Sequence, residues 1–212
     1  SIGGTSAWVP GASGTVPVGL SRLNIVSRLL IYGHSDGYNA LMVLARQVID
    51  TPLGSMAAYA TSDALVMFEF ADEDREAWSK ERLLGAVSAR IYTGRTDMHD
   101  LLEREIAEYF AGALREFTVP LRPVGTEFQL RVWNLLLDIP YGETRTYGEL
   151  AQQIGDPNTV RAVGMANGAN RLAILIPCHR VIGADGSLTG YGGGVWRKQR
   201  LLEIEQGQAG LF

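Results

Sequence analysis

The sequence of 212 residues predicts a small α/β (α+β) domain followed by a mainly helical C-terminal domain that contains a helix-turn-helix. Three observations predict this fold class. β-forming residues alternate over residues 56–70 around a polar turn, and helix-forming segments follow them. Pro120, Pro123 and Gly125 then interrupt the chain. Beyond this interruption, capping signals and a tight turn mark several short helices.

The first 120 residues divide into a leader and a domain. Residues 1–45 show no clear hydrophobic period and are rich in Gly and Ser, so we expect an irregular leader. Residues 46–120 are expected to form the N-terminal α/β domain. Its predicted elements are two strands over 56–70 with a turn at Thr61-Ser62-Asp63, a helix over 72–90 and an amphipathic helix over 98–117.

Residues 121–212 are expected to form the C-terminal domain, and two capping boxes mark the starts of its helices. Thr126 with Gln129, and Thr146 with Glu149, each pair a hydroxyl with a longer polar side chain three residues on. This spacing satisfies the free N–H groups of a first helical turn. Helices are therefore predicted to begin at both threonines.

A helix-turn-helix is predicted in the middle of this domain. The helix over 147–154 stops at Gly155-Asp156-Pro157, and Asn158 is a suitable N-cap for a second helix that ends near Gly168. Helix, tight turn and helix is the layout of many DNA-binding proteins. Helical hairpins of this size are also common packing units, so the pattern alone leaves both interpretations open.

Composition restricts the function classes. Apolar residues make up 46% of the chain and charged residues 20%, which is typical of a folded globular protein. No apolar run is long enough to cross a membrane, and the uncharged, glycine-broken start does not fit a secretory signal. We therefore expect a cytoplasmic protein without membrane contact.

Charge is uneven along the chain. The net charge of −4 argues against a nonspecific nucleic-acid binder. Residues 1–120 hold 10 Lys and Arg against 15 Asp and Glu, a net −5, whereas residues 121–212 hold 9 against 8, a net +1. If the chain binds a polyanion, the C-terminal half is the expected surface.

Cys178 is the one cysteine of the sequence, which excludes an internal disulfide and a zinc site built on several cysteines. The apolar run Ile174-Leu175-Ile176 predicts a buried strand that ends at Pro177 and delivers the thiol to a turn. His179 and Arg180 beside the thiol would favour the reactive thiolate. A single free cysteine is more often a small apolar core residue, so that alternative stays open.

A carboxylate is predicted to share the buried face of the last helix. In the helix over 195–206, Leu201 and Leu202 define the buried face, and Glu205 follows on that face. A buried carboxylate requires a partner, and His179 is available. The two would form a Glu-His-Cys relay in which the imidazole accepts the thiol proton, directly or through a water. The alternative is a frayed helix end with Glu205 in water.

These residues together carry a family resemblance. Pro177-Cys178-His179-Arg180-Val181, preceded by Ile174-Leu175-Ile176, resembles the active-site signature of the O6-alkylguanine-DNA alkyltransferases, including their Ada branch. The resemblance covers about residues 50–210 and is strongest from residue 126 onward. It also includes Tyr147, Arg161, Asn170, Gly190-Tyr191-Gly192-Gly193, Leu201, Leu202 and Glu205.

The resemblance implies direct reversal of DNA alkylation. Cys178 would take the alkyl group from O6 of guanine, or from O4 of thymine, onto its sulfur once per molecule, with no cofactor and no metal. His179, through a water, and Glu205 would lower the pKa of the thiol. Asn170 would hold the turn between the recognition helix and the active-site strand through side-chain hydrogen bonds.

The resemblance also implies the partner, which is double-stranded DNA bound through its minor groove by a monomer with a winged helix-turn-helix. The target nucleotide would rotate out of the stack, and Arg161 would fill the gap. Tyr147 would contact the phosphate beside the flipped base, and small residues such as Ala162 would permit close approach to the sugars. The implied substrate pocket consists of Tyr147, Val181, Tyr191, Gly192 and Gly193.

Three other functions fit part of the sequence. A DNA-binding regulator would use the helix-turn-helix and leave Cys178 inert. A Cys-His hydrolase would use the same residue pair and turn over repeatedly. An alkyltransferase-like protein would bind lesions without repair, but members of that class lack the cysteine.

Overall fold

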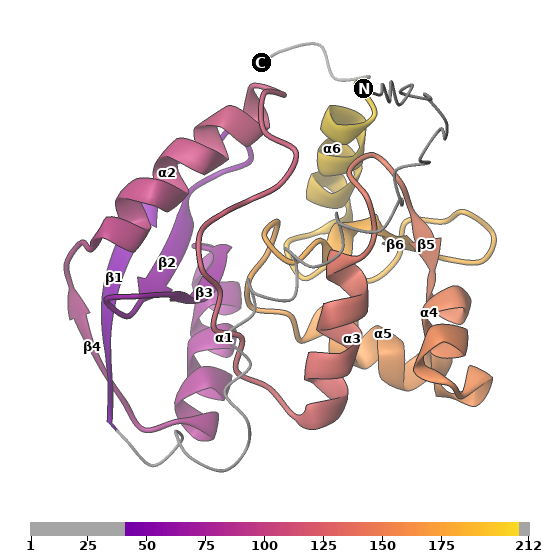
Figure 1. Ribbon diagram of the computed structural model, residues 1–212, viewed down its shortest axis with the longest axis horizontal. Helices are drawn as coiled ribbons and strands as arrows, with labels where there is room; N and C mark the ends of the chain where they lie inside the picture. Colours follow the sequence, from indigo (N-terminus) through magenta and orange to yellow (C-terminus); the bar gives the residue numbers. More distant parts are fainter. Residues whose placement is uncertain (1–40, 208–212) are drawn as a thin grey trace, which may run out of the picture.

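The computed structural model describes residues 41–207. In Figure 1 a four-stranded sheet and two helices lie beside a second lobe of helices and connecting segments. Most of the expected leader over residues 1–45 lies outside the described residues, but residues 42–45 belong to the first strand. Within residues 41–207, no helix is both long enough and apolar enough to cross a membrane.

The sheet has the strand order β3-β2-β1-β4. β2 (Met56–Ala60) and β3 (Leu65–Phe70) pair antiparallel, which confirms the predicted hairpin, and β2 also pairs antiparallel with β1 (Met42–Ile49). β4 (Ala89–Thr93) pairs in parallel with β1 at the edge of the sheet. The helix predicted over 72–90 is therefore too long, because pairing with β1 outweighs the helix propensity of the first residues of β4.

Two helices cover opposite faces of this sheet. α1 (Glu73–Ala86) packs through Leu83 in one apolar cluster, and α2 (Asp97–Phe110) packs through Leu102 in another. Successive residues of β2 alternate between these two clusters, as expected for side chains on opposite faces. α2 ends at Phe110 and not at residue 117 as predicted, because the chain reverses at Gly112, where φ is +73°.

Both predicted capping boxes are present in the second lobe. The Thr126 hydroxyl accepts a hydrogen bond from Gln129 N, and the Thr146 hydroxyl accepts one from Glu149 N. The Gln and Glu side chains accept in return from the N–H groups of the two threonines. The lobe contains α3 (Glu127–Leu137), α4 (Tyr147–Ile154), α5 (Val160–Gly168), α6 (Val195–Glu205) and the parallel strands β5 (Arg145–Thr146) and β6 (Val181–Ile182).

α4 and α5 contact each other across a tight turn. Gly155 ends α4 with φ of +98°, a conformation that glycine adopts at little cost. The N-cap predicted at Asn158 is wrong. Asp156 caps a short 3₁₀ helix, η1 (Pro157–Thr159), and α5 begins only at Val160. A proline at the first position of η1 favours this early start.

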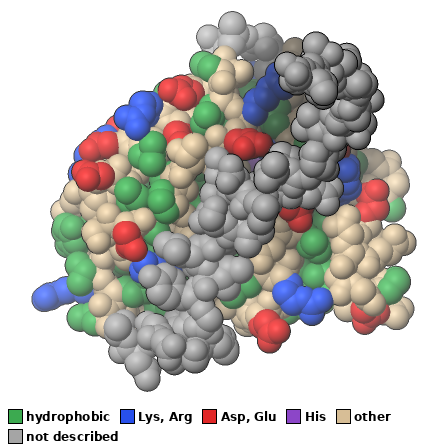
Figure 2. Space-filling model, viewed as in Figure 1, with side chains coloured by type: hydrophobic (Ala, Val, Ile, Leu, Met, Phe, Trp, Pro, Cys, Tyr) green, Lys and Arg blue, Asp and Glu red, His purple; other side chains and the backbone are tan. Residues whose placement is uncertain are grey.

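One apolar core joins the two lobes. Phe68 of β3 and Tyr109 of α2 belong to the same cluster of buried residues as Trp133 of α3, Leu150 of α4 and Leu201 of α6. The core therefore crosses the position near residue 120 where the domain boundary is predicted. On the outside, acidic and basic side chains are interspersed over the face shown in Figure 2.

Candidate active site

The segment before Cys178 is a buried turn, so the strand predicted over residues 174–176 is wrong. Leu172 forms a single parallel bridge with Phe68 of β3. The chain then leaves the sheet, because Ile174 adopts φ of +70° and cannot continue a ladder. That conformation is strained for a β-branched residue. The thiol consequently lies at the start of a 3₁₀ helix, η2 (Cys178–Arg180), and not at the end of a strand.

Asn170 bridges this turn with both ends of its side-chain amide. Its oxygen accepts a hydrogen bond from Leu172 N at 3.0 Å, and its nitrogen donates to Ile176 O at 2.9 Å. Both bonds are buried, which strengthens them relative to exposed ones. Asn170 therefore fixes the backbone that leads into Cys178. A role for Asn170 in the reaction stays a prediction.

The Cys178 side chain is buried in the apolar core, with 6% of the residue exposed. Burial raises the pKa of its thiol to about 11, and a hydrogen bond with Asn170 opposes that shift only in part. Burial thus shifts the pKa of the free thiol in the direction opposite to the one expected from His179 and Arg180, and the reactive thiolate stays a prediction. Burial therefore favours the neutral thiol while the pocket holds no substrate.

Glu205 is buried and accepts hydrogen bonds from four residues, which overturns the alternative of a frayed helix end. Its carboxylate contacts His179 Nε2 at 2.8 Å, Arg180 Nε at 2.8 Å and Nη2 at 2.9 Å, the Tyr109 hydroxyl at 2.8 Å and Gly142 N at 3.1 Å. Burial alone would raise the pKa of Glu205, but His179 and Arg180 hold that pKa well below its usual range. The predicted contact between Glu205 and His179 is confirmed.

His179 is a neutral imidazole with one unpaired nitrogen. The residue is fully buried, and burial lowers its pKa although the Glu205 carboxylate opposes the shift. Since Nε2 faces a carboxylate, Nε2 carries the proton and donates it. Nδ1 is then an acceptor, and within residues 41–207 it has no hydrogen-bond partner. A buried acceptor without a partner, next in sequence to the thiol, can receive a proton.

The predicted pocket residues pack around the same thiol. Val181 is buried in the cluster that contains Cys178, and the partly buried rings of Tyr147 and Tyr191 pack against that cluster. The Tyr147 hydroxyl donates to Thr189 O at 3.2 Å. The Tyr191 hydroxyl is buried without a hydrogen-bond partner in the described part of the chain, and burial raises its pKa well above the ordinary value.

The two predicted glycines of the pocket lie against the N-terminal half of the chain. A side chain at Gly193 would collide with the ring of Phe70, and a side chain at Gly192 would meet the guanidinium of Arg75. Arg75 in turn binds the carboxylate of Glu69. These glycines permit the loop after Tyr191 to approach β3 and α1 closely.

Two buried cations at the start of α6 support this loop, and neither was predicted from the sequence. Lys198 Nζ donates to the carbonyls of Val181 and Thr189, and burial lowers its pKa to about 8. Arg197 donates to Gly193 O at 3.0 Å and pairs with an aspartate of the N-terminal half. Their spacing of three and four residues from Leu201 was an available signal, because it places them on the buried helix face.

The predicted DNA contacts lie at the starts of α4 and α5. Arg161 is exposed in the first turn of α5 and makes no hydrogen bond or ion pair within residues 41–207. Ala162 beside it is partly exposed, and Tyr147 is the first residue of α4. Arg161 can therefore reach a partner outside the chain. In residues 41–207, no three His, Cys, Asp or Glu side chains are grouped to hold a metal ion.

Known proteins resemble the chain over both lobes. Residues 127–207 match the family described as 6-O-methylguanine DNA methyltransferase, DNA binding domain. The methylated-DNA--protein-cysteine methyltransferase of Mycobacterium tuberculosis is 46% identical over 163 residues, which cover 77% of this chain and 93% of the relative.

Solved structures share the mixed α+β fold. The crystal structure of Mycobacterium tuberculosis O6-methylguanine methyltransferase aligns with a TM-score of 0.66 at 43% identity, covering 80% of this chain and 96% of that one. The structure of Mycobacterium tuberculosis OGT in complex with DNA aligns with a TM-score of 0.65 at 44% identity, covering 78% of this chain and 94% of that one.

Proposed function

The chain belongs to the methylated-DNA--protein-cysteine methyltransferase family, and we therefore propose that it repairs DNA by taking an alkyl group from O6 of guanine onto Cys178. One observation carries the assignment of the nucleophile. The sole cysteine of the chain is buried next to His179, whose Nδ1 is an unpaired acceptor and whose Nε2 donates to Glu205. A base next to a nucleophile, oriented in turn by a third group, is the arrangement that activates a nucleophile by removing its proton.

The transfer is a single displacement at the alkyl carbon. The sulfur forms a bond to that carbon while the bond from carbon to O6 breaks, and guanine leaves as an anion. The thiol proton passes through a water to His179 Nδ1, and the Glu205 carboxylate stabilises the resulting imidazolium. The Tyr147 hydroxyl protonates the leaving guanine, and the tyrosinate regains through solvent the proton that His179 took from the thiol. Since the alkyl group is already activated by O6, no cofactor is required.

The product limits each molecule to one reaction. A thioether at Cys178 is not displaced by water, so the sulfur is not regenerated. O4-alkylthymine presents an equivalent activated alkyl oxygen and is a second substrate under this proposal. The monomeric state, the cytoplasmic location and a domain boundary near residue 120 stay predictions.

In this proposal α4 and α5 act as a winged helix-turn-helix that binds the minor groove of DNA. α5 lies inside the segment that matches the DNA-binding family and carries small residues such as Ala162 beside the exposed Arg161. Because a paired base cannot present O6 to a buried thiol, the nucleotide rotates out of the duplex. Arg161 enters the stack in its place, and Tyr191 with Gly192 and Gly193 covers the alkyl group.

Incubation with O6-benzylguanine tests the function. We expect the protein to gain the mass of one benzyl group, confined to the peptide that contains Cys178, with release of one guanine per protein molecule. Continued release of guanine beyond that amount would indicate a Cys-His hydrolase. No mass gain, combined with tight binding to DNA, would indicate a regulator with an inert cysteine.

Arg161→Ala should slow repair about tenfold in duplex DNA, because the gap left by the rotated nucleotide costs a few kcal/mol when it stays empty. In single-stranded DNA no stack must be held open, so we expect a rate within about twofold of the wild type. Transfer of labelled methyl from the two substrates measures this. Equal losses on both would show that Arg161 contacts a phosphate instead, and Arg161→Lys serves as the charge-preserving control.

A further inference from the structure

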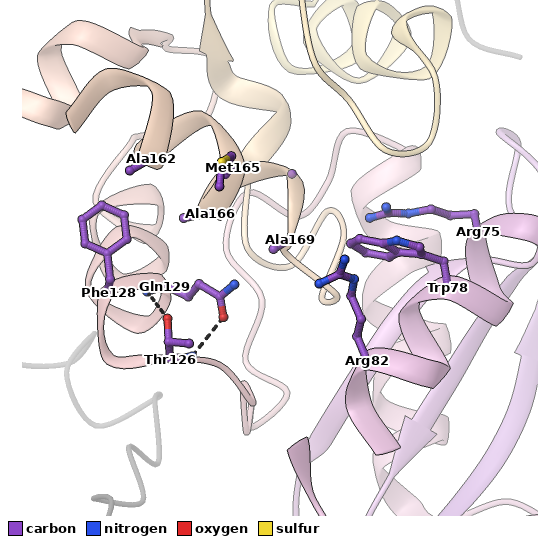
Figure 3. Close-up of a pocket in the computed structure, with 11 residues that line it drawn as sticks. Arg75, Trp78, Arg82, Thr126, Phe128, Gln129, Ala162, Met165, Ala166 and Ala169 are labelled. Atoms are coloured by element: carbon purple, nitrogen blue, oxygen red, sulfur yellow. Dashed lines mark hydrogen bonds between the residues drawn. The ribbon is translucent and has the colours of Figure 1, made fainter. Parts of the chain in front are cut away.

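A groove of about 470 Å³ separates the N-terminal half of the chain from α5, and Cys178 does not line it. Figure 3 shows its two walls. Arg75, Trp78 and Arg82 of α1 form one wall. Ala162 and Met165 of α5, and Ala169 at the C-cap of α5, face them across the opening. The start of α3 closes one end. None of the lining residues within 41–207 is acidic.

The α1 wall is a stacked pair of arginines around one indole ring. The guanidinium carbon of Arg75 lies 4.8 Å from the centre of the Trp78 ring, and that of Arg82 lies 4.4 Å from it. Residues 75, 78 and 82 share one helix face because they are three and four residues apart. Cation–π stacking of this kind orients a guanidinium while leaving its N–H groups available.

The two arginines differ in how their charge is compensated. Arg75 is bound to the buried carboxylate of Glu69, with Nη2 at 2.7 Å from Oε2. Arg82 is exposed, and within residues 41–207 its interaction is with the Trp78 ring and with no carboxylate. Arg82 is therefore the side chain on this wall with N–H groups ready for an anion.

A third guanidinium, that of Arg171, interacts electrostatically with the two arginines of the α1 wall. Arg171 is 8% exposed and donates to Val124 O at 2.6 Å, while its Nε has no partner among the described residues. Burial, and then the like charges of Arg82 and Arg75, lower the pKa of Arg171. Among the described residues, Glu69 is the acidic group that acts on Arg171 in the opposite direction. Arg75, Arg82 and Arg171 therefore lie close enough to one another for their positive charges to interact.

The α5 wall suits the uncharged part of a nucleotide chain. It consists of small residues and of Met165, which is 69% exposed. Small side chains allow close approach, and the thioether is a flexible apolar contact. The same helix lies in the segment that matches the DNA-binding family, so the groove continues the surface that the proposed function assigns to DNA.

We propose that this groove binds the phosphate backbone of the DNA duplex that α5 contacts, with Arg82 as a phosphate ligand and Trp78 as its support. The inference rests on the proposed function, since it requires DNA on α5. It gives the N-terminal half of the chain a direct part in binding. A helix that lies in the minor groove has a phosphate backbone on each side, and α1 stands on one side of α5.

The test compares Arg82→Gln with Arg104→Gln. Both residues are exposed arginines on helices, but Arg104 is on α2, which covers the opposite face of the sheet. Binding is measured by fluorescence anisotropy over a range of salt, on an O6-methylguanine duplex short enough to hold one protein molecule. We expect Arg82→Gln to weaken binding about three- to tenfold and to reduce the salt slope by about 1, with Arg104→Gln near the wild type.

A second measurement separates the groove from the chemistry. Transfer from free O6-benzylguanine requires no phosphate contact, so all three proteins should react at the same rate. The proposal is overturned if Arg82→Gln binds like the wild type, or if Arg104→Gln loses as much affinity. The same binding measurement on a longer duplex is the third comparison. If Arg82→Gln lost affinity only on that longer duplex, a second protein molecule would occupy the groove, and the proposal would again be overturned. Failure of the proposed function is distinct, because the wild type would then transfer from neither substrate.

Discussion

Cys178→Ala is expected to abolish transfer of labelled methyl from alkylated duplex DNA to the protein. The chain has no second cysteine, so no other thiol is available to accept the group. The substitution removes one sulfur from a buried site and should cost only about 1 kcal/mol of stability. DNA binding should stay within about twofold of the wild type, since the residues assigned to DNA lie at the surface of α4 and α5.

Cys178→Ser is the matched control for this prediction. It keeps the size of the side chain and a donor, but a hydroxyl is a far weaker nucleophile than a thiol under the same base. Both variants should therefore bind the duplex and remain unlabelled. Methyl transfer by Cys178→Ala near the wild-type rate would show that the sulfur is not the acceptor, and the proposed function would fail.

Glu205→Gln is expected to destabilise the protein by about 3 to 5 kcal/mol, which corresponds to a fall of roughly 6 to 20 °C in Tm. The carboxylate accepts from Tyr109, His179, Arg180 and Gly142, and an amide cannot accept from all of them. It also leaves the buried charge of Arg180 without a counter-charge. Transfer should slow as well, because the imidazolium formed at His179 loses its stabilising partner.

The loss of stability in Glu205→Gln should depend on pH in a defined direction. The pKa of Glu205 is held well below its ordinary value of 4.5 in the folded protein. Its contribution to stability is therefore complete above that ordinary value and is lost as the pH falls toward the folded pKa. The difference in stability between wild type and Glu205→Gln should be largest near pH 7 and should shrink below about pH 4.5.

Glu203→Gln is the control on the same helix. Glu203 lies two residues away and pairs with Arg200 and Gln199 on the outer side of α6. Glu203 and Arg200 are both partly exposed, and ion pairs near the surface contribute little, so we expect a change within about 0.5 kcal/mol. If the two glutamates have equal effects on melting, or if the difference does not depend on pH, then Glu205 does not act as a buried carboxylate.

The sequence predicted those helices whose ends are set by residues within one helical turn. The capping hydroxyls of Thr126 and Thr146 and the stop at Gly155 act within one helical turn, so α3 and α4 could be placed from the sequence. β1 and β4 could not. Their pairing joins residues separated by more than forty positions, and neither strand alternates clearly between polar and apolar residues.

The candidate site divides in the same way. The contact between His179 and Glu205 followed from helix periodicity and from the cost of a buried carboxylate, and the structure confirms it. The prediction of a strand before Cys178 was wrong because a short apolar run indicates burial but does not determine the backbone conformation. The raised pKa of the thiol could not be predicted either. The neighbouring cations are visible in the sequence, whereas the depth at which the thiol is buried is not.

The contacts of Arg197 restrict which N-terminal and C-terminal halves of related chains can be joined in a chimera. Its guanidinium connects Gly193 O to Leu53 O and to the Asp72 carboxylate, and Gly54, with φ of +113°, leaves room for it. A chimera that joined the first 120 residues of one relative to the rest of another would have to inherit these positions as a set. A crossover point chosen from the sequence alone would separate Arg197 from Leu53 and Asp72, because more than a hundred residues lie between Arg197 and these two partners.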